Sequence, residues 1–502
     1  SSRPTIPKSI SFLSTSQKDD SKMPSSSIAS HKSKKIKPTG RQTEVIYLKP
    51  TQDAVVLGTA GTGKSIMAVL RARFLANPEA MNHGPVLLVT YNNTLIQYLR
   101  YLTPDPSDDI HVETYSKFAR GYLNSVGKMP PRNGIVESDD KLSTMVANAV
   151  REVRKRSNST NFPDLDARFF AEEIIWIADM GITDREQYLN DKRSGRKLNL
   201  DKSERKTVWE VRTEYRKTRK ANNILYDWHD IATAVLNALK VDNRERRYQH
   251  IVIDEGQDLS PEAIRSLKAA VPKNGTVSFF GDYHQQIYKQ GISFRECGLK
   301  ITQSNPIQRF RDNYRNTAQI ARVAIAMSDM PYMDAEQEDL VEPKEPTAAG
   351  AMPTLIKCRD RRSEINEIQR IANHQRELGV VGILTRTWDE AKMATRGIDN
   401  TRCLQRHRGA PWDPTCGIYY GTYHSAKGLE FDVVLMPFCT NKTQLKNQIN
   451  DAYDTEKLDS KEGKLLYVAI TRARTELTVT YSGQVTPLLP ARDGLWKFED
   501  LS

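Results

Sequence analysis

The segment GTAGTGKS, residues 58–65, carries the clearest chemical signature in the sequence. It fits the pattern G-x-x-x-x-G-K-[ST], whose glycines let backbone N–H groups curl around phosphate oxygens. It follows an apolar run and opens a helical one, and a helix N-terminus favours a bound anion. We expect Lys64 to reach the β- and γ-phosphates of a nucleotide and the Ser65 hydroxyl to bind Mg²⁺. The residues that would line the phosphates are Gly58, Thr59, Ala60, Gly61, Thr62 and Gly63.

A second signature is IVIDEGQD, residues 251–258, where β-branched apolar residues run into adjacent carboxylates. Two acids at the end of a buried strand make sense only if a cation neutralises them. Given the phosphate loop, Asp254 would hold Mg²⁺ and Glu255 would polarise an attacking water molecule. The loop alone does not distinguish kinases, GTPases, transporters and motors. The second acid favours hydrolysis, because kinases and small GTPases usually lack it.

These signatures lie in a chain of alternating strand and helix patterns. From about residue 41, short apolar runs alternate with amphipathic segments, which predicts a parallel sheet covered on both faces. Between about 120 and 225, long charged helical segments replace the strands, which predicts a helical insertion. No repeat of fixed period is visible, but two α/β halves are expected because a second set of strand patterns lies at 353–358, 380–386, 417–425, 432–438 and 477–482.

The positive charge of the chain is concentrated at its N-terminus. The net charge is +12, from 74 Lys and Arg against 62 Asp and Glu. Residues 1–41 hold nine of the cations and two of the acids, a surplus of seven that leaves only +5 for the rest. The basic pI is therefore weak support for nucleic-acid binding. Residues 1–38 are rich in Ser, Lys and Pro, which predicts a disordered tail. Within it, HKSKKIKP reads either as a nuclear-localisation patch or as a solubilising segment.

Neither a membrane segment nor a disulfide framework is indicated. The sequence has no apolar run of 18 residues and no signal-peptide pattern. Its cysteines show no C-x-x-C spacing, which argues against a zinc site and against structural disulfides. We therefore expect an intracellular protein, cytoplasmic or nuclear, without membrane contact.

The acidic segment and its neighbours resemble the motifs of superfamily 1 helicases of the UvrD/Rep type. Asp254 to Gln257 followed by Asp258 resembles that family's D-E-x-Q-D motif. Six or seven motifs in the correct order are far more specific than any one alone. The other similar segments, in the family's order, are VTYNNTLIQYL (89–99), HVETYSKFARGYL (111–123), YDWHDIATAVL (226–236), FFGDYHQQIY (279–288), RDNYRNT (311–317), GTYHSAKGLEFDVVLMP (421–437) and LLYVAITRAR (465–474).

The resemblance implies an α/β fold of two RecA-like parallel-sheet motor domains, with a helical insertion in the first. ATP and Mg²⁺ would bind between the two domains. The boundaries that we expect are a tail at 1–38, a first motor domain at 39–120 and 224–306, the insertion at 121–223, a second motor domain at 307–490 and a C-terminal tail at 491–502.

The resemblance also assigns roles to residues outside the phosphate loop. Arg315 and Arg472 align with the family's γ-phosphate arginines, and planar cations suit the charge on a transferring phosphoryl group. Gln285 matches a glutamine that couples the γ-phosphate to movement. Glu430 matches a glutamate that contacts the nucleotide sugar.

An adenine-reading glutamine is expected upstream of the phosphate loop. Gln42 precedes Gly58 by sixteen positions, close to the family spacing, whereas Gln52 precedes it by six. Gln42 is therefore the preferred candidate, with Gln52 as the alternative.

The nucleic-acid contacts implied by the resemblance are aromatic and hydroxyl side chains. Base stacking on aromatic rings is worth ~1–3 kcal/mol each and tolerates any sequence. Each tyrosine could equally be a core residue at a strand end. The basic segment 192–220 reads either as a phosphate-tracking face or as a solvated helix. The candidate contacts are Thr90, Tyr91, Thr114, Tyr115, Tyr288, Thr422 and His424.

Two features depart from the family pattern. Gln290 stands where the family commonly has a tryptophan, and only about 30 residues separate ILTRT from YYGTYHS, so a large accessory domain is absent or rudimentary. We therefore expect an ATP-dependent DNA translocase or helicase, moving 3′ to 5′ if the family's polarity holds. Its substrate would be single-stranded or tailed DNA. We expect a monomer, with a protein loading partner conceivable.

Other functions stay open at this point. The alternatives are an ATP-driven clamp or scaffold that does not unwind, a motor that acts on RNA, and a P-loop enzyme that is not a motor.

Overall fold

The computed structural model divides the chain into two units, Ser1–Ile36 and Lys37–Ser502, and everything below concerns the second. The predicted disordered tail lies almost entirely outside the described residues. Side chains in the last described range are defined from residue 459 onward. The described residues are 38, 41–59, 61–90, 96, 99, 109–131, 134–157, 162–193, 196, 198–282, 294–310, 313, 316–333, 346, 348–404, 417–441 and 452–502.

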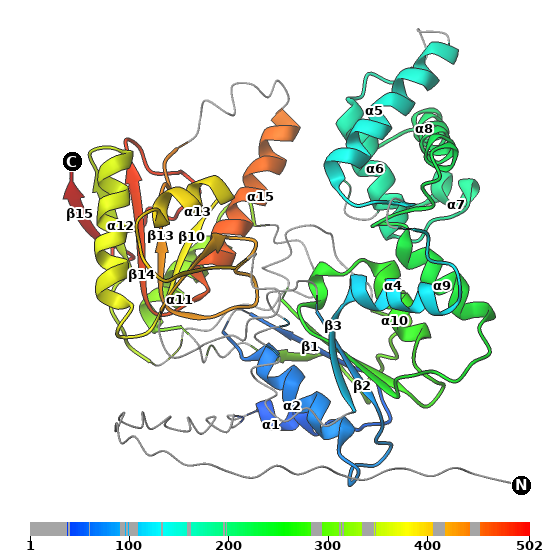
Figure 1. Ribbon diagram of the computed structural model, residues 1–502, viewed down its shortest axis with the longest axis horizontal. Helices are drawn as coiled ribbons and strands as arrows, with labels where there is room; N and C mark the ends of the chain where they lie inside the picture. The colour runs from blue at the N-terminus through cyan, green and yellow to red at the C-terminus, as the bar shows by residue number, and fades with distance from the viewer. Residues whose placement is uncertain are drawn as a thin grey trace, which may run out of the picture. The chain divides into compact units, whose positions relative to one another are not determined.

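The first lobe is built on a six-stranded parallel sheet of order β3-β2-β6-β7-β1-β8. Its inner strands are buried on both faces, which is why they read as continuous apolar runs. Helix α2 packs on one face, and α4, α9 and α10 enclose a core on the other (Figure 1). The bounds are β1 Ala54–Gly58, α2 Lys64–Ala76, β2 Val86–Thr90, β3 Ile110–Thr114, α4 Tyr115–Ser125, β6 His250–Ile253, α9 Ile231–Val241, α10 Pro261–Ala269, β7 Thr276–Gly281 and β8 Gln308–Phe310.

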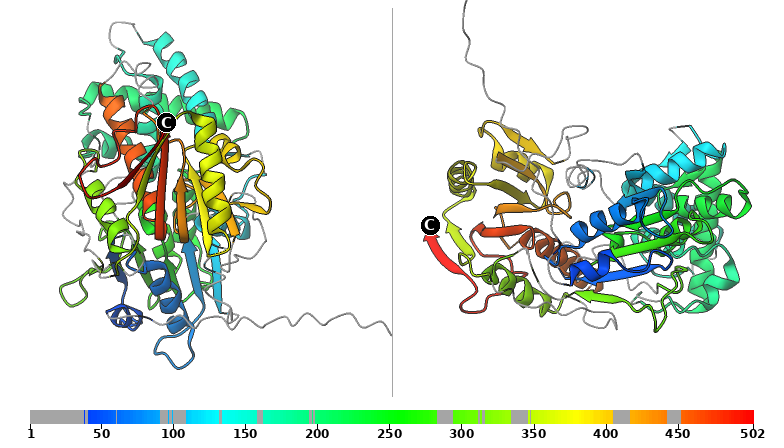
Figure 2. Two further views of the ribbon diagram at one scale, coloured as in Figure 1. Left: turned by 90° about the vertical axis from the view of Figure 1, so that its left-hand side faces the viewer. Right: turned by 90° about the horizontal axis from the view of Figure 1, so that it is seen from below.

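The second lobe is built on a seven-stranded parallel sheet of order β11-β12-β10-β13-β14-β9-β15. Helices α12 and α13 contribute to a core on one face, while α11 and α15 pack on the sheet and on each other (Figure 2). The bounds are α11 Ala318–Ser328, β9 Thr354–Cys358, α12 Arg361–Gln375, β10 Val380–Thr385, α13 Trp388–Thr395, β11 Thr401–Cys403, β12 Gly417–Thr422, β13 Phe431–Met436, α15 Ala452–Ile470, β14 Ala473–Ser482 and β15 Lys497–Leu501.

The two sheets repeat one topology. Taken in chain order, β1, β2, β3, β6, β7 and β8 occupy the same places in the first sheet as β9, β10, β12, β13, β14 and β15 occupy in the second. The second sheet adds only β11 at its edge. The predicted fold class, two RecA-like parallel-sheet domains with a helical insertion in the first, is confirmed.

Two strands lie on the other side of the predicted domain boundaries. β8 pairs with β1, so the first sheet reaches residue 310 rather than ending before 307. β15 pairs with β9, so the segment predicted as a C-terminal tail contributes a strand to the second sheet. Both strands are short edge strands, which carry the weakest periodic signal in a sequence.

The helical insertion has a hydrophobic core of its own. At its base β4 and β5 form a two-stranded parallel sheet. No helix among the described residues is long and apolar enough to cross a membrane. The bounds in this region are β4 Ile135–Val136, α5 Asp139–Arg156, α6 Ala167–Asp179, α7 Arg185–Asn190, α8 Lys202–Ala221 and β5 Tyr226–Asp227.

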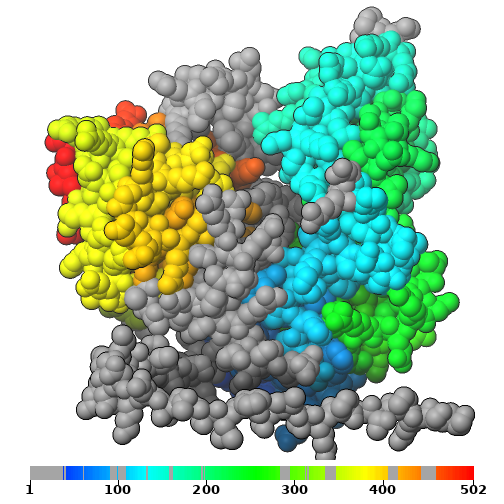
Figure 3. Space-filling view, in the orientation of Figure 1, coloured from blue at the N-terminus to red at the C-terminus, as the bar shows by residue number. Residues whose placement is uncertain are grey.

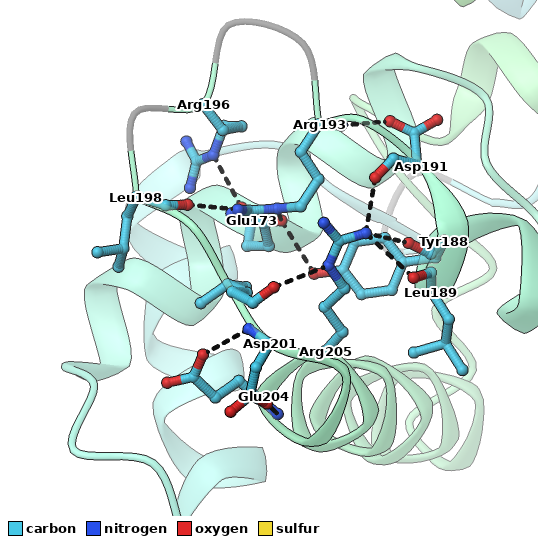
Figure 4. Close-up of polar contacts among 11 residues, drawn as sticks. Glu173, Tyr188, Leu189, Asp191, Arg193, Arg196, Leu198, Asp201, Glu204 and Arg205 are labelled. Atoms are coloured by element: carbon cyan, nitrogen blue, oxygen red, sulfur yellow. Dashed lines mark hydrogen bonds and ion pairs between the residues drawn. The ribbon is translucent and has the colours of Figure 1, made fainter.

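A buried ion cluster centred on Glu173 joins α6 to the loop before α8 (Figure 4). Arg193 donates to both Glu173 oxygens, at 2.6 and 2.8 Å, and Arg196 Nε donates to one of them at 2.8 Å. The Tyr188 hydroxyl donates to the same carboxylate at 2.9 Å. Burial raises the pKa of Glu173, but the two arginines and the tyrosine outweigh it and hold the pKa below its ordinary value. The cluster thus fixes the loop before α8 onto α6.

We predict that Glu173→Gln destabilises the insertion by about 3–5 kcal/mol, because it leaves buried arginine charge without its carboxylate. Hydrogen exchange of the amides in α6, α7 and α8 measures the change. The matched control is Glu172→Gln, which removes a partly exposed pair with Arg168 and should cost at most about 1 kcal/mol. Equal protection of the two variants would contradict the role of the cluster.

Candidate functional site

The phosphate loop connects β1 to the first residue of α2. Gly61 and Gly63 have φ values of +82° and +80°, a left-handed conformation that glycine adopts without strain. A Cβ atom on Gly63 would lie 2.6 Å from the Gln42 amide nitrogen, so the loop also needs glycine for space. The Thr62 hydroxyl donates to the Thr59 carbonyl at 3.0 Å and braces the turn. The loop therefore has the backbone of an anion cradle. Ala60 lies outside the described residues.

Lys64 is held inside this loop. Its Nζ donates to the carbonyls of Gly58 and Thr59, at 2.9 and 2.7 Å, and lies 3.3 Å from a carboxylate oxygen of Asp282 at the end of β7. Asp282 is fully buried, and Lys64 is only 7% exposed. The ammonium group thus waits at the position from which it could reach a phosphate.

Asp254 and Glu255 follow β6 and are buried beside the loop. Burial raises the pKa of Asp254 to about 7, and the charge of Glu255 adds to the rise. The nearby Ser65 hydroxyl and the Lys64 ammonium oppose it. Neither oxygen of Asp254 has a hydrogen-bond partner of normal geometry among the described residues. Such a carboxylate suits a hard cation.

The pKa of Glu255 is shifted in the opposite direction to that of Asp254. Burial raises its pKa, but the surrounding cations and the Gln257 amide outweigh burial and hold the pKa below its ordinary value. Gln257 Nε2 donates to Glu255 at 2.5 Å, and Gln257 Oε1 accepts from the Asp282 backbone N–H at 2.9 Å. Gln257 therefore ties the end of β6 to the end of β7. The cations are Lys427, Arg472 and Lys64.

The second lobe contributes two of those cations. Lys427, which follows β12, forms an ion pair with Asp258 at 2.7 Å, and both side chains are 1% exposed. Arg472 is equally buried, and its Nε donates to the Val468 carbonyl at 3.0 Å. The carboxylates of the first lobe are thus neutralised partly by the second lobe. Of the two predicted γ-phosphate arginines, Arg472 lies near Glu255, and Arg315 lies outside the described residues, as does Gln285.

Several residues at the site were not singled out from the sequence. Asp282, Asp258 and Lys427 belong to quoted motifs, but no role was assigned to them. Asn313 was also missed. Its side-chain amide packs against the phosphate loop so closely that a Cβ atom on Gly61 would overlap it. Only the identity of the motifs could have pointed to these residues, since their partners are far away in the chain.

Gln42 is the better placed of the two upstream glutamines. It begins α1 (Gln42–Ile46), is 4% exposed, and its amide donates to the Thr62 carbonyl at 3.0 Å. Gln52 is half-buried in the turn before β1. Glu430 is half-buried just before β13.

The candidate nucleic-acid contacts meet different outcomes. Thr90 and Thr114 end the adjacent strands β2 and β3 in register, and Thr422 ends β12. Burial and nearby cations lower the pKa of His424 to about 4, so this imidazole is neutral at neutral pH. Tyr91 and Tyr288 lie outside the described residues.

Tyr115, predicted as a stacking residue, is buried. Its ring is 8% exposed in the core of the first lobe, against Phe118. Its hydroxyl hydrogen-bonds to Ser266 at 2.8 Å, and burial raises its pKa. The alternative interpretation, a core aromatic at a strand end, describes it.

The basic segment 192–220 is less cationic on its surface than its composition suggests. Arg193, Arg196 and Arg205 turn inward to a carboxylate or to backbone carbonyls (Figure 4). Arg212 and Arg219 are buried as well. Figure 3 shows part of the outer surface of the insertion in cyan and green. Among the described residues of the segment, the exposed cations are Lys192, Lys202, Lys206, Arg216, Lys217 and Lys220.

Two models of one protein family match this chain. Residues 39–304, more than half of the chain, match the UvrD/REP helicase N-terminal domain, and residues 417–484 match the UvrD-like helicase C-terminal domain. The chain belongs to the UvrD/Rep helicase family. The resemblance inferred from the motifs is therefore confirmed.

Individual relatives are more distant. A probable DNA helicase of Mycoplasma pneumoniae is 24% identical over 450 residues, covering 84% of this chain and 79% of the relative. A probable DNA helicase II homolog of Mycoplasma genitalium is 25% identical over 47% of this chain and 34% of the relative. DNA helicase II of Haemophilus influenzae is 24% identical over 55% of this chain and 38% of the relative. The chain thus spans little more than a third of the length of the last two.

We predict that Lys427→Met lowers the free energy of unfolding by about 3–5 kcal/mol, because it strands the buried Asp258 carboxylate. Urea unfolding of the whole chain measures the loss. The double variant Asp258→Asn, Lys427→Met should recover part of it, since the Asp258 charge that Lys427 compensated is then also removed. A double variant no more stable than the single one would refute the pairing.

Proposed function

We propose that this chain is an ATP-dependent nucleic-acid translocase or helicase. The observation that carries the proposal is the buried carboxylate pair Asp254 and Glu255 beside a glycine-rich phosphate loop. Lys427 and Arg472 of the second lobe lie near this pair, so the charge at the site depends on both lobes. The UvrD/Rep family membership supports the same activity.

The proposed roles follow the geometry. Lys64 and the loop N–H groups would bind the phosphates, and Asp254 with the Ser65 hydroxyl would hold Mg²⁺. The orphaned oxygens of Asp254 fit this ion, which with few protein ligands typically keeps several waters and binds phosphate oxygens. Bound Mg²⁺ would neutralise charge on the phosphates.

The remaining residues would act on the attacking water molecule, on the charge of the γ-phosphate, and on the adenine and sugar of the nucleotide. Glu255 is ionised and can accept a proton from a water molecule. Arg472, with Arg315, would stabilise charge on the γ-phosphate, and Gln285 would couple it to movement. Gln42 would recognise the adenine base, and Glu430 would contact the nucleotide sugar.

For the track we propose single-stranded DNA, with 3′ to 5′ movement as the family's polarity implies. Thr90 and Thr114, which end the adjacent strands β2 and β3 in register, would be phosphate contacts of the first lobe. Thr422 and the neutral His424 would contact the strand from the second lobe. The relatives are named DNA helicases, which favours DNA over RNA.

A second candidate is an ATP-driven clamp that holds nucleic acid without unwinding it. It is favoured by the short connection in the second lobe, where the chain from β10 to β12 contains only α13 and β11 among the described residues. Strand separation on a tailed duplex would count against the clamp.

We predict that Glu255→Gln binds ATP but loses most hydrolysis, by about 10²–10⁴-fold, since the general base is removed while the phosphate loop stays intact. Lys64→Ala should instead weaken ATP binding itself. Steady-state phosphate release and fluorescent-nucleotide titration separate the two effects. Normal turnover by Glu255→Gln would remove this residue from the proposed role.

The experiment that tests the function is phosphate release with and without single-stranded DNA. A nucleic-acid motor should show strong stimulation, lost in Glu255→Gln. Matched single-stranded RNA as competitor distinguishes a DNA track from an RNA track. Hydrolysis that neither strand stimulates would contradict a motor.

A further inference from the structure

Arg71 and Arg472 are the largest side chains among the described residues with less than 2% exposure, and Arg71, unlike Arg472, lies away from the carboxylates of the site. It lies in α2, and Nη1 donates to the carbonyls of Ile46, at 3.0 Å, and Leu48. Nη2 donates to the Lys49 carbonyl at 3.3 Å, and Nε lies 3.4 Å from the Ser278 hydroxyl on β7. One guanidinium therefore binds three carbonyls of a single short stretch.

Burying the Arg71 guanidinium away from water costs free energy that the surrounding groups must offset. A buried cation normally has a carboxylate partner, yet among the described residues none forms an ion pair with Arg71. Its charge is compensated by carbonyl dipoles at the C-terminal end of α1, where the helix dipole is negative. Burial lowers its pKa to about 10, so the group is still charged at neutral pH. The site has been built around a charged guanidinium.

Helix α1, to whose C-terminal end Arg71 binds, is too short to be stable on its own. Helix α1 has five residues and no side-chain N-cap, and isolated helices of this length are not stable in water. Its position depends on tertiary contacts, including the edge-to-face contact of Tyr47 with Phe74 at 5.1 Å. Its first residue is Gln42, whose amide braces the phosphate loop at Thr62. Arg71 thus fixes one end of α1, and the other end touches the loop.

We propose that Arg71 is a positioning residue for the nucleotide base: by clamping the C-terminal end of α1, it sets the Gln42 amide beside the phosphate loop. Through Gln42 it determines ATP affinity and the preference for adenine. The inference rests on the ATP site proposed above. It adds Arg71, which binds the opposite end of α1 from Gln42, as a residue that acts on base selectivity through Gln42.

The test is nucleotide selectivity of the full chain carrying Arg71→Lys, since a lysine ammonium cannot reproduce the planar fork of donors. The KM for ATP should rise roughly tenfold, the equivalent of about 1.4 kcal/mol, with kcat nearly unchanged. The preference for ATP over CTP should fall with it. Gln42→Ala should lose the same preference, and adding Arg71→Lys to it should change nothing more.

A matched control is Arg212→Lys in the insertion. Arg212 is also a buried arginine whose pKa is lowered to about 10, and it donates to the Ile182 carbonyl. It should lose stability without any change in base preference. If Arg71→Lys does not fold, Tyr47→Ala replaces it. Tyr47 is 62% exposed, so its removal spares the fold but loosens the same end of α1 and should weaken the preference.

The outcomes separate cleanly. Unchanged KM and preference in folded Arg71→Lys, or in Tyr47→Ala if that variant is used, would overturn the inference alone. So would effects that add to those of Gln42→Ala. A wild-type chain that neither binds nor hydrolyses ATP would overturn both this inference and the proposed function.

Discussion

Buried negative charge at the carboxyl ends of β6 and β7 is the constraint on which the rest of the structure depends. Asp254, Glu255, Asp258 and Asp282 are each at most 6% exposed. Burying carboxylates is expensive unless cations and hydrogen bonds compensate them. Lys64 supplies one cation from the first lobe, and the second lobe supplies the rest. The two lobes are therefore parts of one electrostatic site, and any change of charge there alters the interaction between them.

The turn that follows β6 in the first lobe has a counterpart in the second lobe that carries no carboxylate. Glu255 lies two residues after β6 with φ +53°, and Phe438 lies two residues after the equivalent strand β13 with φ +65°. The same left-handed turn thus carries a carboxylate in one lobe and a phenyl ring in the other. Fold repeats, but function resides in the side chains grafted onto it.

What could be predicted from the sequence follows from the range of each signal. The phosphate loop and the acidic segment are local patterns, and the strand patterns beside them predicted the parallel sheets. The repeat of topology was invisible as a sequence period because the insertion separates the strands of the first sheet. Pairings such as Lys64 with Asp282 or Lys427 with Asp258 join residues more than 160 positions apart. No periodicity encodes such pairs.

Two side-chain directions could not be predicted from the sequence, for a related physical reason. Tyr115 stands directly after a strand end, where ligand contacts gather, but it also begins an amphipathic helix, and packing of that helix decided its direction. In the segment 192–220 composition counts every cation equally. The structure directs Arg193 and Arg196 to Glu173 instead of to solvent, so part of the charge counted in the composition is not on the surface.

The insertion is joined to the acidic segment through α10. This helix begins three residues after Asp258, and its Glu262 packs so closely on Gly181 that a Cβ atom there would overlap the carboxylate. Arg265 of the same helix donates to the Met180 carbonyl at 2.8 Å. On the other side of the junction, His229 bridges Asp179 and Asp139 at 3.3 and 3.2 Å. Because the insertion has a core of its own, these contacts connect it as a body to α10, the helix that follows β6. Asp258, which pairs with Lys427 of the second lobe, and the insertion are therefore joined through a single short helix.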